Sequence, residues 1–75
     1  DEVVAAFEVL PTDYQTVLIL CDMEGYTYDE IAEFMQAPVG TIRSRIHRGR
    51  KMLGDQLRNY ARARGYGAKR QSLSN

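Results

Sequence analysis

The sequence predicts an all-α protein: a compact four-helix domain that contains a helix-turn-helix. Apolar residues recur at spacings of three and four, which is the period of a helix with one buried face. No segment alternates apolar and polar residues in the way that a half-buried strand does. A chain of 75 residues accommodates one small domain with a thin core.

The first two helices are predicted by apolar spacing and by the residues that interrupt it. Residues 2–9 are expected to form a short amphipathic helix, which Pro11 ends. Thr12 is expected to cap a second helix, which runs to about Glu24 and stops at a left-handed Gly25. The apolar stripe of these helices consists of Val3, Val4, Phe7, Leu10, Tyr14, Val17, Leu18 and Cys21.

The third and fourth helices are predicted to span about residues 27–63, with a short turn between them. Thr27 and Glu30 match a capping box, in which each side chain bonds a free backbone N–H group near the other. Pro38 disfavours helical geometry at Ala37, so the third helix must stop there. The residues expected to face inward are Ile31, Phe34 and Met35 on the third helix, and Ile42, Ile46, Gly49, Leu53 and Leu57 on the fourth.

Charge is segregated along the chain although the formal net charge is zero. Nine of the ten acidic residues lie at or before Glu33, and all ten Lys and Arg residues lie at or after Arg43. Two interpretations are open. The two halves can neutralise each other within the fold, or the basic half can face a polyanion while the acidic, apolar half faces a protein.

Residues 38–51, PVGTIRSRIHRGRK, carry the most informative pattern in the chain. Six basic residues fall between Arg43 and Lys51 with no acidic residue among them, so we expect no helical ion pair to neutralise them. At about 100° per residue, the apolar positions fall on one side of the helix and the polar and basic positions on the other. The outward side comprises Gly40, Ser44, His47, Arg48 and Lys51, flanked by Thr41 and Arg43.

A helix with these two sides suits the major groove of DNA. Its apolar side docks on a core, its small first turn approaches the duplex closely, and arginine can bond guanine through O6 and N7. The alternative is an ordinary solvated helix face. The absence of acidic residues within the segment favours nucleic acid.

Other features restrict the classes of function. A single cysteine, Cys21, allows no internal disulfide, and in its apolar helix we expect a buried, unreactive thiol. The longest apolar run, Val17–Cys21, is far shorter than the roughly 18 residues that cross a membrane. The sequence shows no metal-ligand cluster and no glycine-rich phosphate loop. We therefore expect no enzymatic activity, metal, cofactor, small-molecule substrate or membrane partner, and a cytoplasmic location.

The limits of the domain are also predicted from the sequence. We assign residues 1–64 to the helical domain and residues 65–75, which are small and polar, to a flexible C-terminal tail. Gly65 and Gly67 are expected to end the fourth helix. Because the first residue is Asp1 rather than methionine, we expect a fragment of a longer protein.

Three ordered blocks resemble the C-terminal domain 4 of bacterial sigma factors and look most like the extracytoplasmic-function group. They are LPTDYQTVLIL, GYTYDEIAEFM and PVGTIRSRIHRGRKML, and the resemblance covers about residues 2–60. It implies a helix-turn-helix domain that recognises the −35 promoter element. It also implies docking on the flap of the RNA polymerase β subunit and, in many members, capture by an anti-sigma factor.

Carried over by position, the resemblance implies that Pro38, Gly40 and Thr41 lie where the fourth helix meets DNA. It implies that Arg43, Ser44, Arg45 and Arg48 contact bases or phosphates. The helical projection supports Ser44, His47 and Arg48 best, adds Lys51, and puts Arg45 nearer the edge of the core. On the first two helices, the candidates for a polymerase or anti-sigma surface are Phe7, Leu10, Leu18 and Leu20.

Two other functions fit parts of the pattern. A helix-turn-helix domain of a dimeric regulator would read a palindromic operator, whereas a sigma domain would bind one asymmetric element as a monomer. A helical protein-interaction module would bind no duplex at moderate salt.

Overall fold

The computed structural model describes residues 1–65, and within this range it contains helices and no strand. The elements are α1 (Glu2–Glu8), α2 (Thr12–Leu18), the π-helical segment η1 (Ile19–Met23), α3 (Tyr28–Met35) and α4 (Val39–Ala63). The predicted all-α class with four helices is confirmed. Apart from Gly65, the predicted tail and its Gly67 lie outside the described residues.

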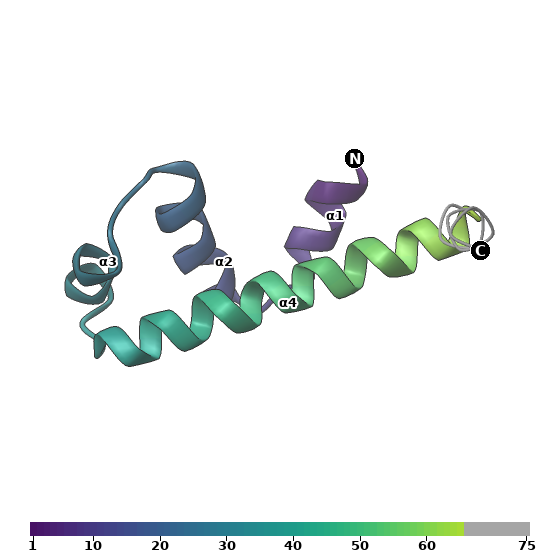
Figure 1. The fold of residues 1–75 in the computed structure, drawn as a ribbon. Helices are drawn as coiled ribbons and strands as arrows, with labels where there is room; N and C mark the ends of the chain where they lie inside the picture. The colour runs from purple at the N-terminus through teal and green to yellow at the C-terminus, as the bar shows by residue number, and fades with distance from the viewer. Residues whose placement is uncertain (66–75) are drawn as a thin grey trace.

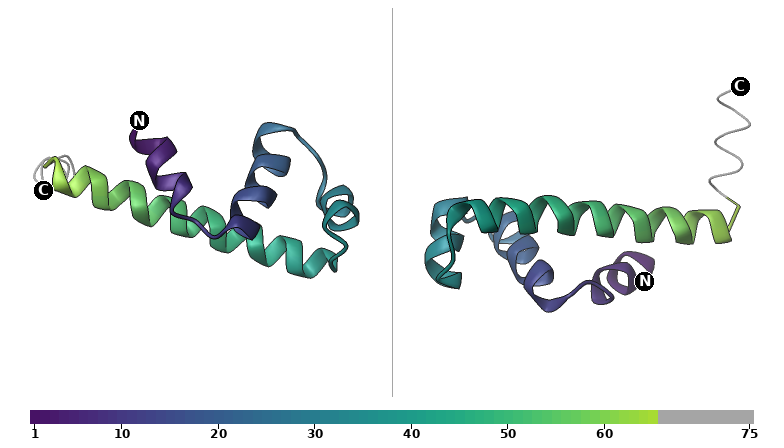
Figure 2. Two further views of the ribbon diagram at one scale, coloured as in Figure 1. Left: turned by 180° about the vertical axis from the view of Figure 1, so that it is seen from behind. Right: turned by 90° about the horizontal axis from the view of Figure 1, so that it is seen from below.

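Helix α4 supports the other three helices. Its 25 residues extend over about 37 Å at 1.5 Å per residue. Helices α1, α2 and α3 each pack against α4, and Figures 1 and 2 show them on one side of it, with α3 at its start and α1 beside its second half. No helix among residues 1–65 combines the length and the apolar character that crossing a bilayer requires.

The buried core lies where α1, α2 and α3 meet α4. Its members are Ala6, Leu10, Val17, Leu18, Ile31, Ile42 and Ile46. Leu10 and Leu18, two of the candidates for a partner surface, are each only 4% exposed and so belong mainly to the core. The reason is packing between helices, since the Leu18 side chain fills the space beside Gly49 of α4.

The helix boundaries confirm some of the predicted caps and correct others. Thr27 accepts a hydrogen bond from the Glu30 backbone N–H at 3.1 Å, and Glu30 Oε1 accepts one from the Thr27 N–H at 2.8 Å, which confirms the capping box. Gly25 has a φ of 78°, as expected for the left-handed end of the second helix. Thr12 is not the cap of α2, because Pro11 holds that position and Thr12 is already helical.

One further helix end differs from expectation, and two others agree with it. The second helix is α-helical only to Leu18 and continues as the π-helical η1, a widening that apolar periodicity does not show. The turn between α3 and α4 places Gln36 in the left-handed region, with a φ of 51°, before Pro38 caps α4. Gly65, with a φ of 84°, follows the last residues of α4 as predicted.

Phe34 does not face the core. Its side chain is 59% exposed, and its ring packs edge-on against Tyr26 with the centroids 5.0 Å apart. Ile31 is fully buried, and Met35 packs against the core cluster as predicted. With only eight residues, α3 meets α4 through a narrow stripe, which leaves Phe34 outside the contact.

Replacing Gly49 with valine is expected to destabilise the domain by about 1–3 kcal/mol more than the same substitution at Gly54. A Cβ at Gly49 would stand 3.2 Å from Leu18 Cδ1 and 3.4 Å from Tyr14 Cβ. At Gly54 it would meet only the flexible end of Arg58, at 3.6 Å. Both glycines lie inside α4, so the change in helix propensity cancels. Urea unfolding followed by far-UV circular dichroism measures the difference, and equal midpoints would contradict the packing argument.

Candidate nucleic-acid interface

The turn between α3 and α4 builds the helix-turn-helix. The left-handed Gln36 allows the Ala37 N–H to reach back to the Ala32 carbonyl at 3.0 Å, which closes α3. Pro38 then accepts at its carbonyl from the N–H groups of Thr41 and Ile42, at 3.0 and 3.2 Å, which opens α4. The first turn of α4 therefore begins beside α3, at the end of the domain away from α1 (Figure 1).

The two predicted sides of α4 are present in the structure. Ile42, Ile46 and Gly49 are buried. The exposed residues of the predicted outward face and its flank are Gly40, Arg43, Ser44, His47, Arg48 and Lys51, while Thr41 and Arg45 are half-buried at its edge. Arg45 thus lies nearer the core edge, as the helical projection predicted.

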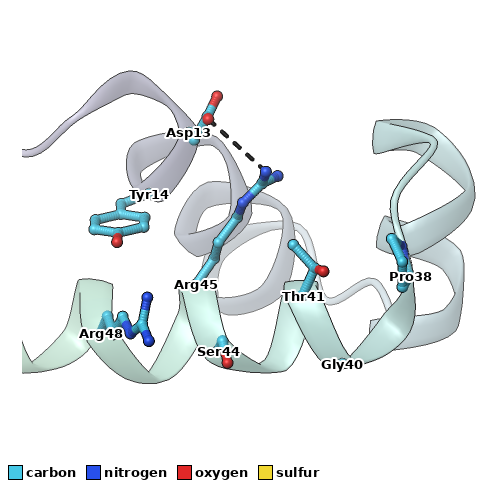
Figure 3. Close-up of a pocket in the computed structure, with 8 residues that line it drawn as sticks. All are labelled: Asp13, Tyr14, Pro38, Gly40, Thr41, Ser44, Arg45 and Arg48. Atoms are coloured by element: carbon cyan, nitrogen blue, oxygen red, sulfur yellow. Dashed lines mark ion pairs between the residues drawn. The ribbon is translucent and has the colours of Figure 1, made fainter.

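An open groove of about 650 Å³ lies between the start of α2 and the first turns of α4 (Figure 3). Six predicted DNA-binding residues line it, namely Pro38, Gly40, Thr41, Ser44, Arg45 and Arg48. The remaining three, Arg43, His47 and Lys51, are exposed on α4 outside the groove. The structure brings most of the predicted site onto one surface. That these residues contact DNA remains a prediction.

Two groove residues were missed by sequence reasoning. Asp13 and Tyr14 belong to the first turn of α2 and line the same groove. Apolar periodicity marked Tyr14 only as part of a buried stripe, and Asp13 only as a helix-start charge. Their position beside residues about thirty places later in the chain follows from the packing of α2 on α4.

Within residues 1–65, three ion pairs join the acidic half of the chain to α4 or to its C-cap residue, Arg64. Arg45 lies 3.9 Å from Asp13, Arg50 lies 2.5 Å from Asp22, and Arg64 lies 2.5 Å from Glu2, measured between nitrogen and carboxylate oxygen. The hydrogen bond to Asp22 raises the pKa of the Arg50 guanidinium, so this arginine stays charged. Part of the opposite charge of the two halves is therefore neutralised within the fold.

The expectation that no helical ion pair neutralises the basic segment is wrong at Lys51. Its Nζ lies 3.3 Å from Asp55, four residues further along α4, and Asp55 also pairs with Arg58. Hydrogen bonds from Arg58 and then Lys51 lower the pKa of the Asp55 carboxyl. Within residues 1–65, Arg43 and Arg48 have no ion-pair partner. These two arginines therefore hold unpaired positive charge on the outward face of α4.

Cys21 is a free thiol packed against the edge of the core. Burial, followed by the charge of Asp22, raises the pKa of the thiol, which opposes formation of the reactive thiolate. Arg50 Nη2 lies 3.8 Å from the sulfur and lowers the pKa of the thiol, but by less than burial and Asp22 raise it. These features agree with the predicted unreactive thiol, although Cys21 is partly rather than fully buried.

An apolar hollow of about 180 Å³ lies on a surface formed by α1, η1 and the middle of α4. Its lining residues are Phe7, Leu18, Ile19, Asp22, Met23 and Leu53. Met23 is 79% exposed, and Ile19 is 36% exposed. Of the four residues expected on a partner surface, Phe7 remains accessible here, while Leu20 packs partly against the core.

The turn between α3 and α4 and the two-sided α4 define the class of protein, which is a helix-turn-helix domain. The chain belongs to the family described as sigma-70, region 4, which it matches over residues 1–53. The resemblance noted from the sequence is thereby confirmed.

Several curated proteins are similar to this chain. It is 44% identical over 57 residues to the ECF RNA polymerase sigma factor SigE of Mycolicibacterium smegmatis, which covers 76% of this chain and 22% of that protein. It is 48% identical over 48 residues to the ECF RNA polymerase sigma-E factor of Haemophilus influenzae, a match that covers 64% of this chain and 25% of that protein. It is 46% identical over 50 residues to the ECF RNA polymerase sigma factor SigW of Bacillus subtilis, a match that covers 67% of this chain and 27% of that protein. The chain thus spans about a quarter of the length of these relatives.

Proposed function

We propose that this chain recognises the −35 element of promoter DNA and thereby helps direct RNA polymerase to initiate transcription. The observation that carries the proposal is the cationic groove at the start of α4, in a chain of the sigma-70 region 4 family. Thr41 and Ser44 offer hydroxyl groups there, and Arg48 offers a guanidinium that has no ion-pair partner within residues 1–65. These groups suit phosphate oxygens and the acceptor-rich edge of guanine.

In this proposal the role is binding, without catalysis. Pro38, Gly40 and Thr41 lie where α4 meets the duplex, and Ser44, His47 and Arg48 face the bases. Arg43, Arg45 and Lys51 lie along the backbone of the DNA. Each basic residue that neutralises a phosphate releases counterions, which supports binding to any duplex. No metal or cofactor has a part in this role.

The protein partner in the proposal is the β flap of RNA polymerase, with an anti-sigma factor as a competitor. The apolar hollow supports this assignment, because Phe7, Ile19 and Met23 leave apolar surface accessible on the side of α4 away from its recognition face. An apolar surface of this kind is typical of an interface with another protein. The complex would act in the cytoplasm, where RNA polymerase and the chromosome are.

Arg48→Ala is expected to weaken binding to the preferred duplex by about 1–3 kcal/mol and binding to a random duplex by less. The expected difference arises because a guanidinium on a base edge reads sequence, whereas one on a phosphate does not. The preferred duplex is first selected from a random library with this chain, and both affinities are then measured by fluorescence anisotropy. Arg50→Ala is the matched control, because it removes the same charge from α4 where Asp22 already binds it.

The outcomes separate the candidate functions. A single asymmetric element bound by one copy of the chain supports the sigma-domain function. A palindrome bound by two copies would indicate a dimeric regulator, and a library with no enriched sequence would contradict promoter recognition. Equal losses on both duplexes would make Arg48 a phosphate contact.

A further inference from the structure

The groove at the start of α4 contains one acidic side chain, Asp13, beside two arginines. Asp13 Oδ2 lies 3.9 Å from Arg45 Nη2. Figure 3 shows the Arg45 side chain extending from α4 toward Asp13 of α2. A carboxylate in this position opposes the binding of a polyanion, so its presence requires a physical explanation.

The ion pair is arranged so that Arg45 can exchange partners. The Arg45 side chain is only 28% exposed, so its stem is held against the domain, whereas Asp13 is 67% exposed and its carboxylate remains hydrated. An ion pair at 3.9 Å with one exposed partner is weak. The fixed stem limits where the guanidinium can go, and the groove between α2 and α4 is within its reach.

We propose that this groove takes a backbone phosphate of the duplex, and that Asp13 competes with that phosphate for Arg45. This inference rests on the proposed DNA-binding function. With Asp13 present, the three charged side chains of the groove, Asp13, Arg45 and Arg48, sum to one positive charge. Asp13 therefore acts as an internal competitor that lowers the affinity of the chain for DNA.

The competition is independent of base sequence. Every duplex offers the same phosphate, and the Asp13–Arg45 pair must open in each case. Because phosphate contacts position a protein without reading sequence, removing Asp13 strengthens binding to preferred and random duplexes by the same factor. A residue that contacted a base would change the ratio of the two affinities.

The test is Asp13→Asn, which keeps the shape of the side chain and removes its charge. Because the Asp13–Arg45 pair no longer has to open, binding is expected to tighten about three- to fivefold near 0.1 M salt on both duplexes. The slope of log affinity against log salt concentration is expected to stay nearly the same, because Arg45 contacts the phosphate in both proteins. Fluorescence anisotropy over a salt series gives both quantities, and circular dichroism verifies that the variant is folded.

Two control variants make the test specific. Asp22→Asn removes the same unit charge and also frees an arginine of α4, Arg50, but outside the groove. It is expected to change DNA affinity less than twofold. In a chain that carries Arg45→Gln, Asp13→Asn is expected to have a much smaller effect, because the residue for which Asp13 competes is gone.

Several results would overturn the inference while leaving DNA binding intact. These are an unchanged affinity for Asp13→Asn, a gain equal to that of Asp22→Asn, a full gain in the Arg45→Gln background, or unequal gains on the two duplexes. Failure of the unaltered chain to bind any duplex would instead reject the proposed function, and the inference with it.

Discussion

Raising the salt concentration fourfold is expected to weaken binding of this chain to duplex DNA about a hundredfold. The estimate follows if about four phosphates are contacted, because each contact contributes about 0.9 to the slope of log affinity against log salt concentration. The arginines available for these contacts are the unpaired Arg43 and Arg48, and Arg45 once it leaves Asp13. The half-neutralised Lys51 completes the set. Anisotropy titrations at constant pH give the slope.

A matched pair of variants tests which charges set the slope. Arg43→Gln removes an exposed cation that has no ion-pair partner within residues 1–65, and we expect the slope to fall by about 0.9. Arg50→Gln removes a cation that Asp22 holds at 2.5 Å, and we expect the slope to stay the same. A response to salt that is flat for the unaltered chain would contradict nucleic-acid binding altogether.

Ile46→Ala is expected to destabilise the domain by about 2–5 kcal/mol. Ile46 is 1% exposed and belongs to the same buried cluster as Ile42, Val17 and Ile31. Removing its branched side chain forfeits buried apolar contacts and leaves a cavity that the short helices around it close only in part. The loss is a large share of the total stability of a small domain, about 5–15 kcal/mol.

The measurement is the free energy of unfolding in urea, followed by far-UV circular dichroism. Val4→Ala serves as the control, because Val4 is 52% exposed on α1 and is expected to change the stability by no more than about 0.5 kcal/mol. Ile46 faces away from the groove, so the variant is expected to bind DNA normally at temperatures where it remains folded. Similar losses for the two variants would mean that the core lies elsewhere.

The two sides of α4 could be predicted because they depend on short-range physics. Once residues 39–63 are helical, a rotation of about 100° per residue decides that Ile42 and Ile46 share one side and that Ser44 and Arg48 share the other. The capping box at Thr27 and Glu30 and the left-handed Gly25 are equally local, since each involves residues within three positions. The family resemblance rested on the same local blocks.

Contacts between distant segments could not be predicted in this way. The apolar pattern leaves open whether Leu18 faces the core or a partner, because α2 has apolar residues on more than one side, and only its packing against Gly49 shows that it is buried. The apolar stripe of α3 predicts that Phe34 is buried. The contact of α3 with α4 is narrower than that stripe, so Phe34 stays exposed. The continuation of α2 as η1 has no periodic signature either.

The sequence alone determined the helices, the helix-turn-helix and the polar and basic side of α4, because backbone geometry and capping act over a few residues. The tertiary structure decided which of the basic residues are available to DNA. It brings Asp13 to Arg45, Asp22 to Arg50 and Glu2 to Arg64, across separations that no local pattern encodes. Charge acts through space rather than along the chain, so the distribution of free charge on the recognition face follows from how α1, α2 and η1 pack on α4.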